Sequence, residues 1–283
     1  GGPAQTGRLD ARSLRWQLFR KLTQLSMLTL VVWAAANMLW RNFKVAHNNA
    51  RLVELLSDPF TAKLYDWNDR LLEWLGGWIG LGPLELSERF LGEPWALTLG
   101  PFHLVDPMAV GSVLVQGQSL STGTLLMSLL PLLLAAVLGK VFCSFLCPAR
   151  LAFEVGSALR LGLIWLGLPL PTIRLPRIGG FVLVGALLFA AGSGSAVLHF
   201  TLPYLAFASA VVAAVATGTV SAAAFAFGTM FAVDVLVAPG QICHSLCPTG
   251  ALLETAGRFS LLRLRKRPEP CPPSCSLCQR ACP

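Results

Sequence analysis

Residues 122–148 read TGTLLMSLLPLLLAAVLGKVFCSFLCP, an apolar run that ends in the cysteine pair of Cys143–Pro148. Residues 222–248, AAAFAFGTMFAVDVLVAPGQICHSLCP, follow the same plan and end in Cys243–Pro248. In both motifs the order Cys-x-x-Leu-Cys-Pro, with a Glu six residues after the Pro, recurs at a displacement of 100 residues. The repeat predicts two related helical hairpins, each ending in a pair of cysteines.

The composition around these motifs indicates a membrane protein. Of 283 residues, 54% are hydrophobic and 13% charged, and the mean hydropathy is +0.64. A soluble core of this length needs far less apolar content. Because a helix needs roughly 20 mostly apolar residues to cross a bilayer, we expect an all-α integral membrane protein with four transmembrane helices: Leu22–Trp40, Thr122–Val141, Ile178–His199 and Ala214–Val237.

These spans divide the chain into segments. The predicted organisation is a basic lead (1–21), the first span (22–40), an outer segment (41–121), the second span with its motif (122–150), an inner loop (151–177), the third span (178–199), an outer connection (200–213), the fourth span with its motif (214–248) and a C-terminal segment (249–283).

The distribution of positive charge predicts the orientation. Sixteen of the 22 Lys and Arg residues lie before residue 22, between 140 and 177, or after 257, and basic residues accumulate on cytoplasmic flanks. Both termini and all eight cysteines are therefore expected in the cytoplasm. The formal charge of +8 is explained by topology and attraction to the inner leaflet, so no nucleic-acid partner is expected.

Two features of the N-terminal part leave alternatives open. The apolar run with Ala34–Ala36 also has the form of a cleavable secretion signal, although its basic lead is long for one. In the outer segment, Leu64, Trp67, Leu71 and Trp78 recur near helical spacing, which predicts an amphipathic helix lying in the membrane interface. This helix is either a surface anchor or a lid or docking face.

The C-terminal cysteines form a third group, Cys271, Cys275, Cys278 and Cys282, with Pro283 after the last. Apart from a longer first interval, the spacing is that of a bacterial ferredoxin run, so we expect [4Fe–4S] ligation. Zinc is the alternative, but zinc pairs are usually separated by a longer loop. In two-cluster ferredoxins the Cys before Pro binds the other cluster, and no second motif follows here. Either these four cysteines share one cluster or the natural chain continues beyond Pro283, and we expect the latter.

The paired motifs also favour metal or redox chemistry, because the cytoplasm is reducing and disfavours structural disulfides. Cysteines at i and i+4 share a helix face and can approach one metal centre. Packed hairpins could thus bring four thiolates to one [4Fe–4S] cluster; another metal or thiol cycling stays open. The predicted ligands are Cys143, Cys147, Cys243 and Cys247.

With these motifs in this order, the chain resembles the NapH-type membrane ferredoxins, a group that includes the membrane core of NosR and the CcoG/RdxA-like proteins. The resemblance covers roughly Arg20 to Pro283. It implies a bacterial inner-membrane, multi-pass protein, a quinol-linked electron-transfer subunit that feeds a periplasmic reductase or respiratory complex, or assists the metal centre of that reductase. An iron–sulfur or cytochrome protein is the implied partner. The outer segment is long for NapH, which leaves the particular pathway open.

A quinone site requires a membrane-facing pocket with polar groups that exchange protons. An acidic residue within an apolar span usually faces an interior partner, and His244 could donate to a cluster sulfur. The candidates for a quinone or proton site are Asp234, His199, Tyr204, His103 and Asp106.

Three functions remain open at this stage. The first is an electron conduit linked to quinol, serving as a quinol dehydrogenase subunit within a complex. The second is a metal-handling or maturation factor that reduces or delivers copper or iron. The third is a scaffold subunit of a larger respiratory complex. Catalysis by the chain alone is not expected, because it has no nucleotide motif and no Cys-x-x-Cys-His haem-attachment sequence.

Overall fold

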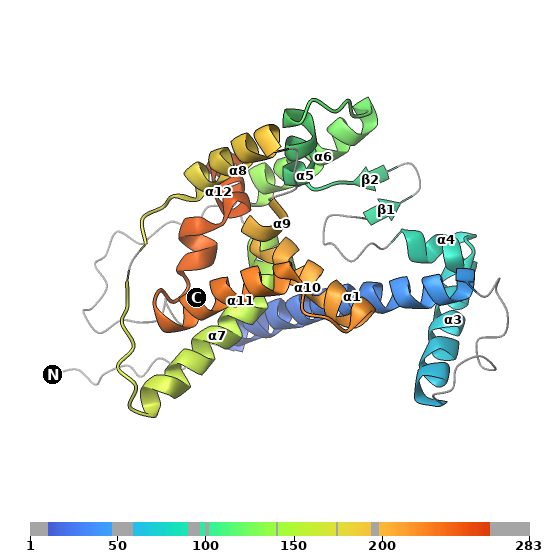
Figure 1. The fold of residues 1–283 in the computed structure, drawn as a ribbon, viewed down its shortest axis with the longest axis horizontal. Coiled ribbons are helices and arrows are strands. Elements are labelled where there is room, and N and C mark those ends of the chain that lie inside the picture. Colours follow the sequence, from blue (N-terminus) through green and yellow to red (C-terminus); the bar gives the residue numbers. More distant parts are fainter. Residues whose placement is uncertain are drawn as a thin grey trace.

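A computed structural model describes residues 11–46, 59–89, 97–99, 102–139, 141–173, 175–193 and 198–260. The chain folds as a set of helices around a long N-terminal one (Figure 1). This helix, α1 (Ala11–Ala46), has 36 residues and is about 54 Å long. It contains the only segment of the described ranges that is long and apolar enough to cross a membrane, Arg15–Val45.

Two further predicted spans are helical but shorter than expected. Helix α6 (Thr122–Leu138) begins at Ser121, whose hydroxyl accepts a hydrogen bond from the Thr124 backbone N–H, and ends at Gly139. Gly139 has φ 75°, a backbone conformation that glycine adopts without strain. Helix α8 (Gly179–Ser193) covers most of the third predicted span. The helical character of both stretches is confirmed.

The fourth predicted span, Ala214–Val237, is divided in the structure. Helix α10 (Pro203–Thr217) ends at Gly218, which has a left-handed conformation with φ 63°. After a short turn, α11 (Ala222–Leu236) begins at the cap Ser221. The residues 200–213, expected to be a connection, are mostly helical, because hydropathy alone does not detect the glycine break in this apolar stretch. Helix α10 packs on α1, and α11 packs on α10 (Figure 1).

Each Cys-x-x-x-Cys motif forms a short π-helical turn, Phe142–Leu146 and Ile242–Leu246. The turns are followed by α7 (Pro148–Trp165) and α12 (Pro248–Ala256). In both cases proline takes the first helical position, where its missing N–H costs nothing. A single 3-10 turn, Gly257–Phe259, ends the described chain after α12.

The outer segment holds two helices and a small sheet before it reaches α5. The predicted amphipathic stretch is the helix α3 (Pro59–Ile79), followed by α4 (Pro83–Glu88). The strands β1 (Leu97–Leu99) and β2 (Phe102–Leu104) pair antiparallel, Leu97 opposite Leu104. This hairpin corrects the expectation of a purely helical chain. Helix α5 (Pro107–Val115) then leads to α6, and the four-residue α9 (Leu198–Thr201) precedes α10.

The described chain has two apolar cores. The smaller joins Trp40 of α1 to Leu72 of α3 and Leu86 of α4, where α3 crosses the end of α1 (Figure 1). The larger surrounds the two π-turns and includes Phe142 and Ile242, the residues before the first cysteine of each motif. The fold therefore places the cysteine motifs in the centre of its main core.

Candidate iron–sulfur site

The four cysteines of the two motifs lie near one another although 100 residues separate the pairs. Cys147 interacts electrostatically with Cys143 and Cys247, and Cys243 interacts with Cys147 and Cys247. All four are free thiols of intermediate exposure. The arrangement agrees with the prediction that packed hairpins bring both motifs together.

The second cysteine of each motif also begins a helix. Cys147 is the N-terminal cap of α7, and Cys247 is the cap of α12. Burial raises the pKa of both thiols to about 12, and the backbone N–H groups that follow each cysteine lower it again in part. A helix N-terminus favours negative charge. Thus the positive N-terminal ends of α7 and α12 lie at the sulfur atoms of Cys147 and Cys247. With their raised pKa, these thiols need a bound metal to become thiolates near neutral pH.

The two turns are held by backbone carbonyls. In the first, the Ser144 carbonyl accepts a hydrogen bond of 2.9 Å from the Gln24 side chain of α1. In the second, the Ser245 carbonyl accepts one of 3.0 Å from the Ile178 backbone N–H. Gly179 follows Ile178, and a Cβ there would lie 3.0 Å from the Cys247 carbonyl. At Gly179 the start of α8 therefore packs so closely on the second turn that a larger side chain would crowd the Cys247 carbonyl.

Asp234, a predicted quinone or proton candidate, lies at the second turn. Its side chain is 1% exposed, and its Oδ1 accepts a 3.5 Å hydrogen bond from the Ile242 N–H. Its Oδ2 has no hydrogen-bond partner. The carboxylate thus holds the backbone one residue before Cys243 and leaves one oxygen available.

Arg160, which the sequence analysis did not single out, supports the same region. This buried side chain donates to the carbonyls of Val235 at 2.6 Å and Pro171 at 2.7 Å, and to the Thr172 hydroxyl at 3.1 Å. It therefore ties α7 to the end of α11. A long basic residue in a helix usually reaches water, so only the packed fold could reveal it as buried.

Tyr204 and Asp106 lie elsewhere than expected. The prediction put them on the outer side of the membrane, yet the Tyr204 hydroxyl donates to Asp106 Oδ2 and accepts from Thr249, two residues after Cys247. The error follows from the divided fourth span, which brings the start of α10 to the cysteine turns. His103 belongs to β2 and His199 to α9; their side chains lie outside the described part, as do residues 261–283 with the ferredoxin-like run.

The two glutamates of the repeat form ion pairs with basic side chains next to the motifs. Glu154 pairs with Arg20 at 3.3 Å, with Arg150 at 3.4 Å and with Lys21. Glu254 pairs with Arg177 at 3.3 Å, and the same guanidinium lies 3.4 Å from His244 Nε2. His244 thus has a partner outside the cysteine group. Through Glu154, the basic part of α1 lies beside the helix that follows the first motif.

The donor set is that of an iron–sulfur cluster. Within the described ranges, no three Cys, His, Asp or Glu side chains are arranged to hold one metal ion. Cysteine thiolates are the ligands of [4Fe–4S] clusters, and helix N-termini favour the negative charge that such a group carries. The chemistry of the four thiols at two helix N-termini therefore fits a [4Fe–4S] cluster.

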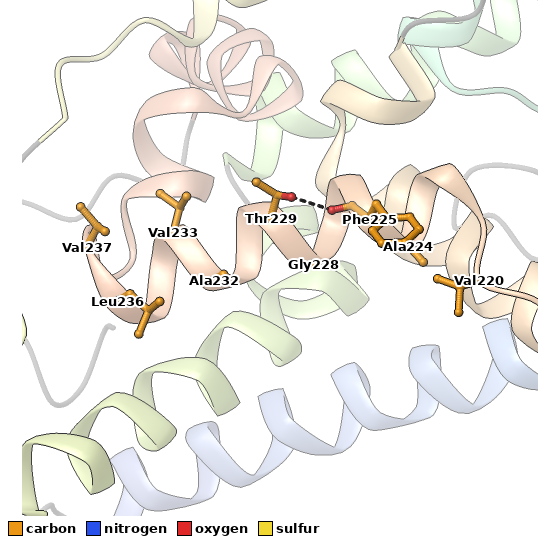
Figure 2. Close-up of a pocket in the computed structure, with 9 residues that line it drawn as sticks. All are labelled: Val220, Ala224, Phe225, Gly228, Thr229, Ala232, Val233, Leu236 and Val237. Carbon is orange, nitrogen blue, oxygen red and sulfur yellow. Dashed lines mark hydrogen bonds between the residues drawn. The ribbon is translucent and has the colours of Figure 1, made fainter. Parts of the chain in front are cut away.

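Two apolar hollows lie on α11. The shallow groove in Figure 2 runs along one face of the helix between Val220 and Val237; it contains no cysteine and no charged residue, so it is a surface rather than a reaction site. A second cavity of about 340 Å³ reaches the cysteine site. Its lining includes Cys247, Ile242 and the hydroxyl-bearing Thr201 and Thr229.

Comparison with known proteins supports this geometry. The family described as "4Fe-4S binding domain" matches residues 120–164 and 202–268. These two segments contain both Cys-x-x-x-Cys motifs and end before Cys271. A ferredoxin-type protein NapH of Haemophilus influenzae is 29% identical over 73% of this chain and 74% of its own length. The chain is thus similar to NapH-type ferredoxins over most of its length.

Other relatives of this chain agree. The methylamine utilization ferredoxin-type protein MauN of Paracoccus denitrificans is 28% identical over 74% of this chain and 68% of its own length. An uncharacterized protein of Methanocaldococcus jannaschii is 30% identical over 56% of this chain, and the match spans 58% of that protein. No solved structure matches the chain. The 4Fe-4S binding domain and the ferredoxin-type relatives together support an iron–sulfur electron-transfer protein.

Proposed function

We propose that this protein takes electrons from quinol in a bacterial inner membrane and passes them to another redox subunit through [4Fe–4S] clusters. One cluster is held by Cys143, Cys147, Cys243 and Cys247. A second is held by the C-terminal run of Cys271, Cys275, Cys278 and Cys282. The observation that carries the proposal is the grouping of four free thiols at two helix N-termini.

The cluster would supply one-electron redox chemistry, and the chain's own residues would bind and shield it. The N–H groups at the starts of α7 and α12 act on Cys147 and Cys247 and stabilise negative charge there. The surrounding apolar core contains Phe153 and Leu253. Such a shell excludes water and thereby influences a cluster's potential.

The arrangement of helices supports a membrane location. Helix α1 is long enough to cross a bilayer, and α6, α8, α10 and α11 are shorter apolar helices. Because α10 and α11 form a hairpin whose open end lies at the cysteines, both can cross beside α1 with the cysteines on the inner side. In this topology α10 takes the place of α8 as the third span, since both the start of α8 and the following α9 lie beside Cys247. Four helices then cross, and the motifs stay cytoplasmic.

The cavity beside Cys247 supports quinol as the electron donor. Its Thr201 hydroxyl donates to the Leu198 carbonyl and its Thr229 hydroxyl to the Phe225 carbonyl. Each oxygen therefore offers lone pairs rather than a hydrogen to a ligand. Quinol O–H groups are donors, so the cavity suits the reduced carrier in an apolar site with few polar groups.

The test is metal analysis and electron paramagnetic resonance on the purified full chain. We expect iron and acid-labile sulfide, with a reducible signal that Cys143→Ser and Cys243→Ser each abolish. Ser144→Ala, in the same turn with its carbonyl intact, should retain the signal. Equal iron content in both cysteine variants and wild type, or zinc in place of iron, would refute the shared cluster.

A separate measurement tests the donor. Quinol added anaerobically should reduce the cluster in wild type and more slowly in Thr229→Val, which keeps the shape of the cavity and removes a hydroxyl. Ser157→Ala is the control, since its hydroxyl likewise donates to a helix carbonyl, at Phe153, on α7. Reduction of the cluster at equal rates in Thr229→Val and wild type would show that this cavity is not the quinol site.

A further inference from the structure

Tyr204 contacts both cysteine motifs. Its ring meets the Phe142 ring edge-on, with the centroids 6.1 Å apart, and Phe142 directly precedes Cys143. Its hydroxyl lies 3.5 Å from the Thr249 hydroxyl, two residues after Cys247. Tyr204 is 2% exposed. One side chain thus contacts a residue beside each of the two pairs of thiols.

The same hydroxyl is fixed by a carboxylate. Tyr204 donates its hydrogen to Asp106 Oδ2, while Asp106 Oδ1 accepts a 2.9 Å hydrogen bond from the Met108 N–H and caps α5. Asp106 is 4% exposed and Thr249 3%. Since Tyr204 has a single O–H, its bond to Asp106 leaves the oxygen lone pairs for Thr249. The hydroxyl direction is therefore defined from both sides.

We propose that Tyr204 is a positioning residue that spaces the two cysteine turns and, through its hydrogen bond to Asp106, sets the reduction potential of the cluster they hold. The inference rests on the proposed function, because it requires the shared cluster. A donor to a buried carboxylate offsets part of its negative charge. Without that donor, the Asp106 charge acts more strongly at Cys247, with which it interacts, and an added electron is less favourable.

The test is a redox titration of the signal that Cys143→Ser abolishes. Tyr204→Phe keeps the ring contact and removes the hydroxyl, so we expect unchanged iron content and a more negative midpoint potential. The expected size is about a tenfold change in the ratio of oxidised to reduced cluster at fixed potential, which is about 59 mV for one electron. Tyr65→Phe is the matched control, because Tyr65 is the only other tyrosine and packs on Phe43 of α1.

A second variant separates the hydrogen bond from simple packing. Asp106→Asn keeps an oxygen that can cap α5 but removes the charge, so its potential should be more positive than wild type. Adding Tyr204→Phe to Asp106→Asn should then change the potential little. This non-additivity is not expected if the tyrosine only fills space.

The outcomes are distinct. An unchanged potential in Tyr204→Phe, or additive shifts in the double variant, would overturn the inference. If the Tyr204→Phe protein did not retain iron, the midpoint potential of Asp106→Asn would serve as the test. A midpoint potential equal to that of wild type would refute the proposed role of the Tyr204–Asp106 hydrogen bond. A wild-type protein without a Cys143-dependent signal would instead refute the proposed function before any tyrosine variant is titrated.

Discussion

The turns Phe142–Leu146 and Ile242–Leu246 have the same conformation and the same proline after the second cysteine, but different charged side chains lie around them. The first lies beside Arg20, Lys21 and Arg150, which surround Glu154. The second lies beside Arg177 and, in addition, beside two buried carboxylates, Asp234 near Cys243 and Asp106 near Cys247. The motifs therefore supply matching ligands, whereas the two sides of the site have different electrostatics.

The difference extends to how each turn is held. The backbone of the first turn accepts a hydrogen bond from one side chain of α1, Gln24, and its aromatic rings pack on Phe19 and Tyr204. The second is supported by Asp234 and, through the end of α11, by Arg160. We therefore expect the second turn to be more sensitive to substitution than the first, and the following variants test this from the largest effect to the smallest.

Arg160→Met should destabilise the protein by about 3 kcal/mol, because the carbonyls that its guanidinium bonds would be buried without donors. The measurement is the thermal unfolding temperature in detergent. Arg177→Met is the control, since the Arg177 side chain is 67% exposed and its ion pair should contribute little. Equal shifts in the two variants would show that Arg160 is not a central support.

Asp234→Leu introduces the residue found 100 positions earlier, at Leu134. It leaves the Ile242 N–H without its acceptor but also removes a buried Oδ2 that has no partner, so the net cost should be about 2 kcal/mol. Leu134→Ala should cost less, because Leu134 is 45% exposed. Chemical unfolding followed by circular dichroism compares them. An Asp234→Leu protein as stable as wild type would mean that both turns tolerate an apolar residue there.

Gly250→Ala should cost about 1–2 kcal/mol, since the new Cβ would lie 3.0 Å from the Cys243 carbonyl and the turn would have to shift. The line shape of the electron paramagnetic resonance signal of the cluster should change as well. Gly162→Ala in α7 has open space around it and should be neutral or slightly stabilising. An unaltered line shape in Gly250→Ala would argue against close packing at the second turn.

Gln24→Leu should have the smallest effect, below about 1 kcal/mol. It removes the bond to the Ser144 carbonyl but also a buried Oε1 that has no partner, and the two effects oppose each other. The thermal unfolding temperature of Gln24→Leu, measured together with that of Asp234→Leu, compares the stability losses at the two turns. A larger loss for Gln24→Leu than for Asp234→Leu would reverse our ranking of the two turns.

The sequence predicted what its repeats encode. The equal spacing of the motifs indicated that Cys143 and Cys243 belong to matching structures, and apolar runs located α1, α6 and α8. It did not predict the positions of Tyr204 and Asp106, because these depend on Gly218 dividing an apolar stretch that hydropathy treats as continuous. Arg160 and Gln24 were missed for a related reason: their burial comes from tertiary packing rather than from local pattern.

The division at Gly218 also affects the surrounding lipid. Helices α10 and α11 have 15 residues each, about 22 Å of helix, whereas the hydrocarbon layer is about 30 Å thick. In the proposed topology, lipid next to this hairpin must become thinner to match it. Thinning would bring the inner cysteine turns nearer the opposite water layer.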